Sequence, residues 1–419
     1  MNVSLAKSEI SGTVRAPSSK SYTIRGMMCG ALAPGTSDIR HPLLADDTEA
    51  AAEVLGKIGV AVTKQEDVWQ VCGGSLRAPA GELFCRDSAA TLRFLTALCA
   101  LVPGECRLTA GPSLARRPVK PLVTALQKLG VKCSSEGEFP PVTVTGGRLE
   151  GNSTEIRGDI SSQFISALLL IAPRAARGMN IRLTTPLVSR PYLEMTLDCM
   201  QTFGVKVTAR DDGFTAKRQD YRPARYDVEG DWSSASYLLA LGATGGEVTV
   251  TNLEPASRQG DRVLLDFLQE MGAPVNVNRR EVTVRNAALR SLKADLSDCI
   301  DLLPTMAVLA AAADGTSELT GIRRARLKES DRVAAVAEGL NQLGIRNTVE
   351  EDRMVITGGR PHRGSISSWG DHRIAMAFSV LGAAFGGVTV KDAESVGKTF
   401  PDFWAILEKM GGRLTRDEQ

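Results

Sequence analysis

Two acids in the sequence stand out as candidates for proton transfer, one between cations and one at the head of an apolar run. Glu329 sits between Lys328 and Arg332 in RLKESDRVAAV, and Asp301 opens the apolar run CIDLLPTMAV. Neighbouring cations and desolvation can tune the pKa of a carboxyl group for general acid or base work. For Asp301 an alternative stays open at this stage, because an acid just ahead of Pro304 could simply cap its helix.

Basic residues and hydroxyls recur at the starts of predicted helices, where free backbone N–H groups and the helix dipole bind anions. A single arginine of this kind is usually part of a surface salt bridge. So many in a chain of net charge +2 instead indicate a concentrated positive field for small polyanions. The hydroxyls and one amide indicate a hydroxylated, phosphorylated ligand. The residues are Lys20, Ser21, Arg25, Arg93, Arg116, Arg117, Ser161, Ser162, Gln163, Ser189, Arg190, Lys328, Arg332, Arg373 and Lys398.

A repeated pattern must position these side chains. Six glycines, spaced 67 to 74 residues apart, each end an amphipathic helix and precede a predicted strand. Glycine suits a helix C-terminus because that position often needs a left-handed backbone. Repetition at this period predicts a supersecondary unit that holds two helices and several strands. The glycines are Gly59, Gly130, Gly204, Gly272, Gly344 and Gly411.

Each unit also contains a second, more apolar helix with a polar entry. Its hydrophobic run predicts a helix packed inside a layer of other helices. Capping alone explains the plain entry DWSSASYLLALG equally well, but a cap does not need the cations of the other entries. The six entries read SSKSYTIRGMM, DSAATLRFLTAL, ISSQFISALLLI, DWSSASYLLALG, DLLPTMAVLAAA and DHRIAMAFSVLG.

The six units divide most naturally into two groups of three. The Arg-, Pro- and Tyr-rich segment KRQDYRPARYDVEGD, from Lys217 to Asp231, separates units three and four and has the composition of a crossover. The residues up to Arg15 precede the first polar-entry helix and could pair with either half. A chain of 419 residues is also too long for one compact core.

Composition excludes several classes of protein. The chain shows neither the basic excess nor the basic tract of a nucleic-acid binder. Its lightly charged apolar runs, about 10–14 residues long, fall short of a bilayer span, and a signal-peptide pattern is not evident. Eight scattered cysteines without CxxC pairs, together with three histidines, argue against disulfides and a structural zinc. We therefore expect a cytoplasmic protein with no membrane or nucleic-acid partner.

Several motifs together resemble one known family. SSKSYTIR, SSQF, SRPY, DLLP, LKESDR, DHR and GKTFPDF occur in the order and spacing of the 5-enolpyruvylshikimate-3-phosphate (EPSP) synthases, or 3-phosphoshikimate 1-carboxyvinyltransferases. The resemblance covers about Pro17 to Phe403. It implies a two-domain inside-out α/β barrel, with three βαβαββ repeats in each domain. The implied domains are residues 1–16 plus 230–419 and residues 17–229, with crossover segments near 14–18 and 226–232.

The resemblance also implies the reaction. Family members transfer the enolpyruvyl group of phosphoenolpyruvate to the 5-hydroxyl of shikimate 3-phosphate, in the shikimate pathway of aromatic amino acid biosynthesis. No metal or organic cofactor is implied, and a monomer is expected. Asp301 is similar to the residue that handles the hydroxyl proton and Glu329 to the residue that serves the methylene carbon, with Lys20 between the two substrates.

Binding residues carry over position by position. The residues that resemble shikimate 3-phosphate contacts are Lys20, Ser21, Arg25, Ser161, Ser162, Gln163, Ser189, Asp301 and Lys328. The residues that resemble phosphoenolpyruvate contacts are Lys20, Ala89, Arg117, Gln163, Arg332, Arg373 and Lys398.

Two rival functions remain open. The sister enzyme that transfers the same group to UDP-N-acetylglucosamine usually carries a cysteine in the mobile loop before an Arg-Pro pair. That loop reads GPSLARRPV here, with Leu114 and Ala115 and no cysteine. The second rival is a non-catalytic repeat scaffold for anionic partners, which would not need acids such as Asp301 and Glu329 among its cations.

The stretch RDSAATLRF departs most from the family. Ala89 stands where a glycine is usual, so its methyl group adds to the wall of the phosphoenolpyruvate pocket that the resemblance implies. Glyphosate occupies that pocket and is slightly longer than phosphoenolpyruvate, so we expect tolerance to glyphosate. Asp87 and Arg324 both replace a usual asparagine. Asp87 could pair with Arg93 or favour its helix N-terminus.

Overall fold

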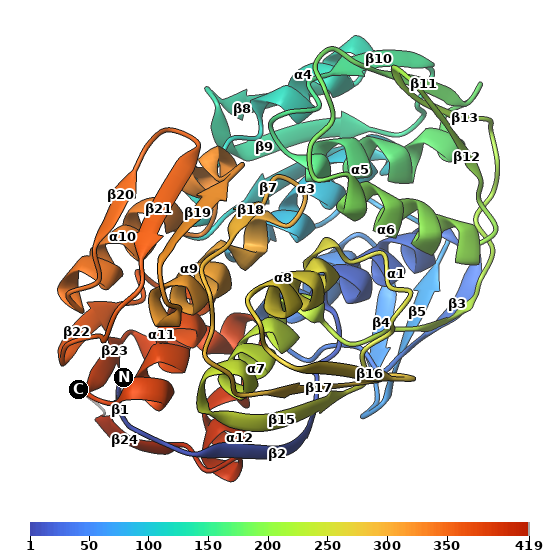
Figure 1. Ribbon diagram of the computed structural model, residues 1–419. Coiled ribbons are helices and arrows are strands. Elements are labelled where there is room, and N and C mark those ends of the chain that lie inside the picture. Colours follow the sequence, from blue (N-terminus) through green and yellow to red (C-terminus); the bar gives the residue numbers. More distant parts are fainter. Residues whose placement is uncertain (418–419) are drawn as a thin grey trace. The chain divides into compact units, whose positions relative to one another are not determined.

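The computed structural model describes residues 1–417, whose strands form six four-stranded sheets (Figure 1). All six sheets share one pattern. Two strands at one edge are parallel, and the remaining two each run antiparallel to their neighbour. One topology found six times shows that the repeat predicted from the glycines is a structural unit.

The chain separates into two compact units. Unit 1 comprises Met1–Pro17 and Gly230–Gln419, and unit 2 comprises Ser18–Glu229. The elements of unit 2 are α1 (Lys20–Leu32), β3 (Gly35–Arg40), α2 (Asp46–Lys57), β4 (Ala61–Lys64), β5 (Val68–Gly73), β6 (Leu83–Phe84), α3 (Ala89–Leu98), β7 (Gly104–Thr109), α4 (Lys120–Lys128), β8 (Lys132–Glu136), β9 (Phe139–Gly146), β10 (Ser153–Ile156), α5 (Ser162–Ile171), β11 (Met179–Leu183), α6 (Arg190–Thr202), β12 (Val207–Arg210), β13 (Gly213–Ala216) and β14 (Arg225–Asp227).

Unit 1 is built in the same way. Its elements are β1 (Asn2–Ala6), β2 (Ile10–Arg15), α7 (Trp232–Gly245), β15 (Gly246–Thr251), α8 (Leu264–Glu270), β16 (Val275–Asn278), β17 (Glu281–Arg285), β18 (Lys293–Asp295), α9 (Leu303–Ala312), β19 (Thr316–Thr320), α10 (Arg332–Gln342), β20 (Asn347–Val349), β21 (Arg353–Thr357), β22 (Gly364–Ser367), α11 (His372–Phe385), β23 (Val388–Lys391), α12 (Phe403–Lys409) and β24 (Arg413–Asp417). Short 3-10 helices, named η, join some of these elements.

Strands from distant parts of the chain complete three of the repeats. In unit 2, β14 pairs with β3, so the last strand of the unit joins its first repeat. In unit 1, β1 inserts between β23 and β24, and β2 pairs with β15. The N-terminal segment therefore belongs to the C-terminal half of the chain. Of the two pairings that the sequence left open for it, this is the one found.

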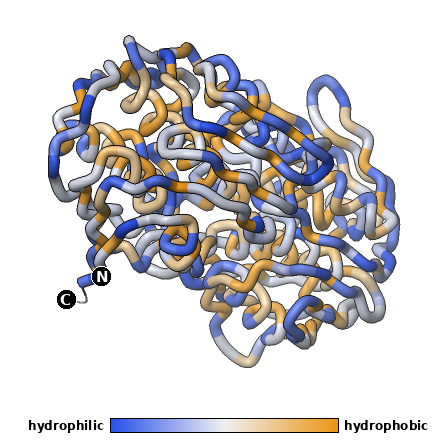
Figure 2. Tube along the Cα trace, turned by 60° about the horizontal axis from the view of Figure 1, so that its bottom comes forward, coloured by the Kyte–Doolittle hydropathy of each residue, from blue (hydrophilic) through white to orange (hydrophobic). Residues whose placement is uncertain are grey.

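The polar-entry helices form the interior of each unit, as predicted. All ten residues of α3 are buried, and the same holds for α5 after its second residue and for α9 up to its half-buried last residue, Ala312. In unit 2, α3 packs between α1 and α5, and in unit 1, α11 packs against α7 and α9. Hydrophobic segments accordingly run through the interior of the trace in Figure 2, whereas many peripheral loops are hydrophilic.

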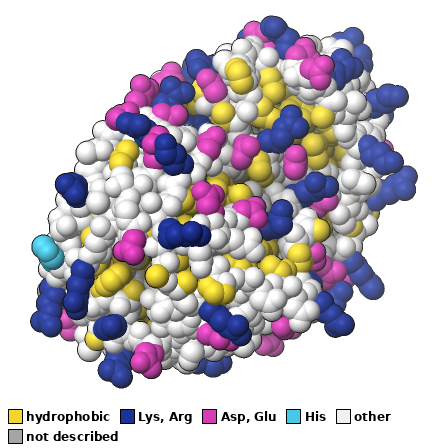
Figure 3. Space-filling model, in the orientation of Figure 1, with side chains coloured by type: hydrophobic (Ala, Val, Ile, Leu, Met, Phe, Trp, Pro, Cys, Tyr) yellow, Lys and Arg dark blue, Asp and Glu magenta, His cyan; other side chains and the backbone are white. Residues whose placement is uncertain are grey.

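The outer surface carries both signs of charge. Lys and Arg side chains are interspersed with Asp and Glu over the face drawn in Figure 3. Among the helices of residues 1–417, none combines the length and the hydrophobicity that crossing a bilayer requires. Because both signs of charge are mixed over this face, the positive field that the sequence predicts must be local, at particular helix starts.

The predicted helix C-termini are confirmed. Each of the six repeat glycines lies just after the end of its helix and has a positive φ, from 74° at Gly344 to 99° at Gly411. At Gly130 φ is 79°, and an added Cβ would meet no atom within 4 Å. Only the backbone conformation therefore requires glycine at that position.

We predict that Gly130→Ala lowers the free energy of unfolding by ~1–2 kcal/mol, because a left-handed residue with a Cβ is strained. Gly56 is the matched control. It lies in the last turn of α2 at an ordinary φ with no neighbour within 4 Å, so Gly56→Ala should gain up to about 1 kcal/mol. Urea unfolding of both variants measures the pair. Equal changes would contradict the assignment of strain to Gly130.

Candidate functional site

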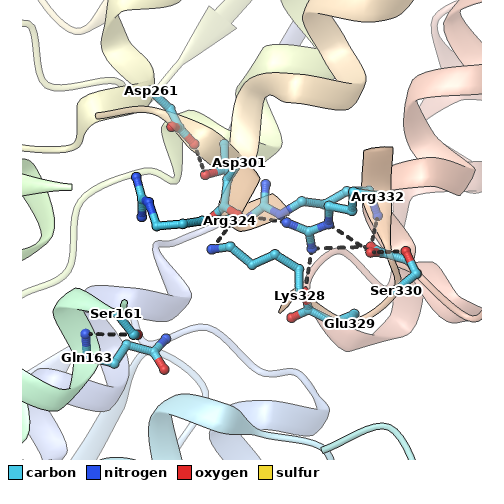
Figure 4. Close-up of polar contacts among 12 residues, drawn as sticks. Ser161, Gln163, Asp261, Asp301, Arg324, Lys328, Glu329, Ser330 and Arg332 are labelled. Atoms are coloured by element: carbon cyan, nitrogen blue, oxygen red, sulfur yellow. Dashed lines mark hydrogen bonds and ion pairs between the residues drawn. The ribbon is translucent and has the colours of Figure 1, made fainter. Parts of the chain in front are cut away.

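In unit 1, three carboxylates share the guanidinium of Arg332, the first residue of α10 (Figure 4). The Nε donates to Asp371 at 2.8 Å, one terminal nitrogen donates to Asp301 at 2.7 Å, and the other donates to Glu329 at 2.5 Å. The Arg332 side chain is 1% exposed. Burial acts to lower its pKa, but the carboxylates of Asp371, Glu329 and Asp301 outweigh burial, so the pKa is raised above its ordinary value.

Asp301 is also held by two further cations. The Lys328 Nζ lies 3.1 Å from one of its oxygens, and Arg373 lies 3.4 Å from the other. Burial acts to raise the pKa of Asp301, yet Arg373, Lys328 and Arg332 together hold it well below its ordinary value. Asp301 lies inside the short helix η5 (Ile300–Leu302), and Leu302 precedes α9. Its carboxylate therefore serves this network of charges, and the capping alternative is not supported.

Helix caps fix the positions of the charged side chains around Asp301. Asp371 is the N-cap of α11 and accepts the backbone N–H of Arg373 at 3.0 Å, while its other oxygen accepts from Ser330 at 3.0 Å. Asp331 caps α10 by accepting the N–H of Ala334. Two helix starts thus fix the positions of Arg332 and Arg373, since each arginine is the first or second residue after its cap.

In unit 2, Arg25 is a buried cation whose partners are all neutral. It donates to the Thr196 hydroxyl at 2.8 Å, to the Tyr192 carbonyl at 3.1 Å and to the Ser21 carbonyl at 3.0 Å. Its guanidinium also lies over the Phe94 ring, 5.2 Å from the centroid. Burial lowers its pKa, and the hydrogen bonds that it makes within residues 1–417 go to a hydroxyl and two carbonyls, not to a carboxylate. A buried guanidinium held in this way is ready to receive an anion.

Lys20, the first residue of α1, contacts an acid that the sequence analysis missed. Its Nζ lies 2.9 Å from Asp47, whose side chain is buried at the start of α2. The Thr91 hydroxyl of α3 donates to the Asp47 carbonyl at 3.3 Å. Asp47 therefore joins the starts of three helices and orients the ammonium group of Lys20.

Arg93 binds the residues at the start of α5. It donates to the amide oxygen of Gln163 at 2.7 Å and to the Ser161 hydroxyl at 3.4 Å, and its guanidinium lies over the Phe164 ring. Ser161 is the N-cap of α5 and accepts the N–H of Gln163 (Figure 4). Asp87 accepts the N–H of Leu114 at 2.8 Å, so it anchors the loop that leads to Arg117.

The other predicted residues lie at the expected helix starts and loops. Ala89 is the first residue of α3, and Ser189 is the N-cap of α6 in a left-handed conformation without a side-chain cap bond. Ser162 and Arg117 are buried. Lys398 ends η7 (Ala393–Lys398), which packs against α11, and Arg324 in η6 (Arg323–Leu327) donates to the carbonyl of Ser297.

Three acids near these sites lay beyond the candidate residues that the sequence indicated. Asp47 and Asp261 come from segments without a distinctive motif, DDTEAAAEVL and SRQGDRV. Asp371 stands beside the predicted Arg373 and was counted only as part of a helix entry. A cap signal could have drawn attention to Asp371, but only the tertiary fold shows Asp47 beside Lys20 and Asp261 near Asp301.

Comparison with known proteins decides the family. The sequence model of the EPSP synthase (3-phosphoshikimate 1-carboxyvinyltransferase) family matches residues 5–407. The chain belongs to this family. A 3-phosphoshikimate 1-carboxyvinyltransferase of Dehalococcoides mccartyi is 47% identical over the whole of both chains. One from Methanothermobacter thermautotrophicus is 42% identical over 99% of each.

Solved structures agree with the sequence relatives. EPSP synthase of Acinetobacter baumannii superposes with a TM-score of 0.84 at 25% identity, over 99% of this chain and all of the other. The enolpyruvyl transferase NikO of Streptomyces tendae shares the fold, with a TM-score of 0.79 at 19% identity, over 99% and 98% of the two chains. The predicted family resemblance, the inside-out α/β fold and the assignment as a transferase of this family are confirmed, and the UDP-N-acetylglucosamine alternative is less well supported.

We predict that Arg332→Leu lowers the free energy of unfolding by about 3–5 kcal/mol at pH 7, because it leaves buried carboxylates without their shared cation. Arg285→Leu is the control, since Arg285 forms an exposed pair with Glu247 on the sheet surface. That change should leave the urea midpoint unmoved. A midpoint for Arg332→Leu equal to that of the control would show that the network does not hold the unit together.

Proposed function

We propose that this chain transfers the carboxyvinyl group of phosphoenolpyruvate to the 5-hydroxyl of shikimate 3-phosphate, releasing phosphate. The observation that carries the proposal is that two acids, Asp301 and Glu329, bind the same buried guanidinium, that of Arg332. Two proton transfers at different substrate atoms need two acid–base groups, and the cations around them compensate the negative charge of both substrates.

Unit 2 supplies most of the contacts that we assign to shikimate 3-phosphate. Arg25 suits the ring carboxylate, because it is a buried cation whose hydrogen bonds in the described chain go to neutral groups. Serines at helix starts suit the phosphate, since their hydroxyls and the free N–H groups of the first turn converge on an anion. The full set is Lys20, Ser21, Arg25, Ser161, Ser162, Gln163, Ser189, Asp301 and Lys328.

Phosphoenolpyruvate carries a carboxylate and a phosphate on three carbons, so it needs several cations in a small volume. Arg332 and Arg373 at the starts of two helices, and Arg117 after the loop anchored by Asp87, offer planar donor pairs for such groups. The full set that we assign to it is Lys20, Ala89, Arg117, Gln163, Arg332, Arg373 and Lys398. Arg332 is shared by three acids here, so an incoming anion would compete with them for its donors.

The chemistry then proceeds in two steps. Asp301 accepts the proton of the 5-hydroxyl while the hydroxyl oxygen bonds to C2 of phosphoenolpyruvate. At the same time Glu329 delivers a proton to C3, which becomes a methyl group. In the second step the bond from C2 to the phosphate oxygen breaks, Glu329 takes a proton back from the methyl group, and the double bond returns. The proton that Asp301 accepted leaves with the departing phosphate, so both acids return to their starting states. Lys20 bridges the two substrates and stabilises the charge that develops between them.

We also propose that residues 1–16 with 230–419, and residues 17–229, act as two domains of a cytoplasmic monomer that takes small-molecule substrates and no nucleic acid. The connecting passages, near 14–18 and 226–232, run side by side. The N–H of Asp231 donates to the Pro17 carbonyl, and the N–H of Ser19 donates to the Glu229 carbonyl, both at 2.8 Å.

Phosphate release tests the proposal. The purified protein should release one phosphate per phosphoenolpyruvate consumed when shikimate 3-phosphate is present, and none with either substrate alone. Release with UDP-N-acetylglucosamine instead would favour the sister reaction. Release with neither acceptor would favour a binding scaffold and refute the proposed transfer.

We predict that Glu329→Gln binds both substrates yet lowers kcat by about 10²–10⁴-fold, the usual contribution of a positioned acid–base group. The control is Glu338→Gln, an exposed position on α10, which should leave kcat unchanged. Calorimetric binding and steady-state rates separate the two effects. A kcat near that of the wild type would remove Glu329 from the proton chemistry.

We predict that Ala89→Gly makes the enzyme more sensitive to glyphosate. Relief of an overpacked contact of about 1–3 kcal/mol corresponds to a glyphosate Ki lower by about 5- to 150-fold, with a smaller change in the KM for phosphoenolpyruvate. Ala97→Gly, on the same helix but near its C-terminal end, should leave the ratio of Ki to KM unchanged. Potent inhibition of the wild type that is competitive with phosphoenolpyruvate would refute the predicted tolerance.

A further inference from the structure

A second buried carboxylate lies behind Asp301. Asp261 belongs to the short helix η4 (Gly260–Val263), and it is only 2% exposed. Its Oδ2 accepts a hydrogen bond from the Ser233 hydroxyl, whereas its Oδ1 is buried without a hydrogen-bond partner in residues 1–417. Figure 4 shows Asp261 next to Asp301. An ionised carboxylate with a bare buried oxygen is costly, so this environment favours the protonated form.

The charged groups that face Asp261 come from three neighbouring elements. Asp301 and the thiol of Cys299 belong to η5 and its cap, Asp231 caps α7, and Arg373 is the second residue of α11. Two of these groups are acids and one is a cation. Burial and the charges of Asp301 and Asp231 outweigh Arg373 and the Ser233 hydrogen bond, and they raise the pKa of Asp261 from 3.8 to about 7.

The pKa values of Asp261 and Asp301 are therefore shifted in opposite directions. Three cations hold the pKa of Asp301 well below its ordinary value, which keeps Asp301 ionised but makes it a weak proton acceptor. A negative charge placed next to it would make it a stronger one, because like charges disfavour each other's ionisation. Asp261 is placed to supply such a charge without touching the substrates.

We propose that Asp261 is a positioning residue that sets the base strength of Asp301, holding a proton beside it and, on losing that proton, making Asp301 a better acceptor. This inference rests on the proposed role of Asp301 in the transfer reaction. As pH rises through neutrality, Asp261 ionises, and the step in which Asp301 takes the hydroxyl proton should become faster.

The first test is the pH dependence of kcat. In the wild type, kcat should rise about three- to tenfold between pH 6 and pH 8, because a stronger base accepts a proton faster. Asp261→Asn mimics the protonated acid at every pH, so this rise should be lost while the KM values change little. Asp266→Asn, an exposed position on α8, is the matched control and should keep the wild-type profile. A rise that persists in Asp261→Asn, or a flat wild-type profile, would overturn the proposal.

The second test needs no substrate. The pKa of Asp261 is higher in the folded protein than in the unfolded chain, so its stabilising contribution is complete below about pH 4 and is lost as pH rises towards 7. The Tm of Asp261→Asn relative to the wild type should therefore be higher at pH 8 than at pH 5. An unchanged difference would contradict a proton held on Asp261. If the protein fails to transfer the carboxyvinyl group at all, this measurement still reports on Asp261, so the two failures are distinguishable.

A third readout uses the wild-type protein alone and therefore does not depend on the variant folding. With ¹³C-labelled aspartate carboxyl groups, one resonance of the wild-type protein should titrate close to pH 7. Absence of any aspartate resonance that titrates above pH 6 would overturn the proposal.

Discussion

The buried guanidinium of Arg332 is the interaction on which unit 1 depends. Its donors reach carboxylates from η5, from the segment before α10 and from the cap of α11, so one side chain joins three elements. A buried charge is costly unless it is paired and hydrogen-bonded, and here each partner compensates the other. Because an unpaired charge is costly here, an incoming anion that replaces one of the carboxylates around Arg332 would change how that carboxylate is held.

The repeated topology explains why such charges can gather. Each repeat contributes one buried helix, and its start combines free N–H groups with caps and hydroxyls. In unit 2, three of these starts hold Lys20, Ala89 and Ser162 as their first residues, with Asp47 and Arg93 bonded to groups beside them. The buried apolar bodies of these helices form the rigid core, so the residues at their polar starts can vary without loss of core packing.

Local features were predictable and long-range ones were not. The glycines that end six helices, the buried polar-entry helices and the cluster LKESDR follow from patterns within about ten residues. The N-terminal strands could have paired with either half, and only the structure shows β1 between β23 and β24. Asp47 and Asp261 escaped notice for the same reason, since their importance comes from neighbours that are distant in sequence, Lys20 and Asp301. Motifs that match a family identified most of the candidate residues, while their partners required coordinates.

The central claim is that acids held among cations move a proton onto and off C3 of phosphoenolpyruvate during transfer. Proton NMR of the reaction run in D2O tests it most directly. If C3 becomes a methyl group by accepting a proton that exchanges with solvent, the methylene group of the product must carry deuterium. A product whose methylene retains only its original hydrogen atoms, formed at the normal rate, would contradict the account.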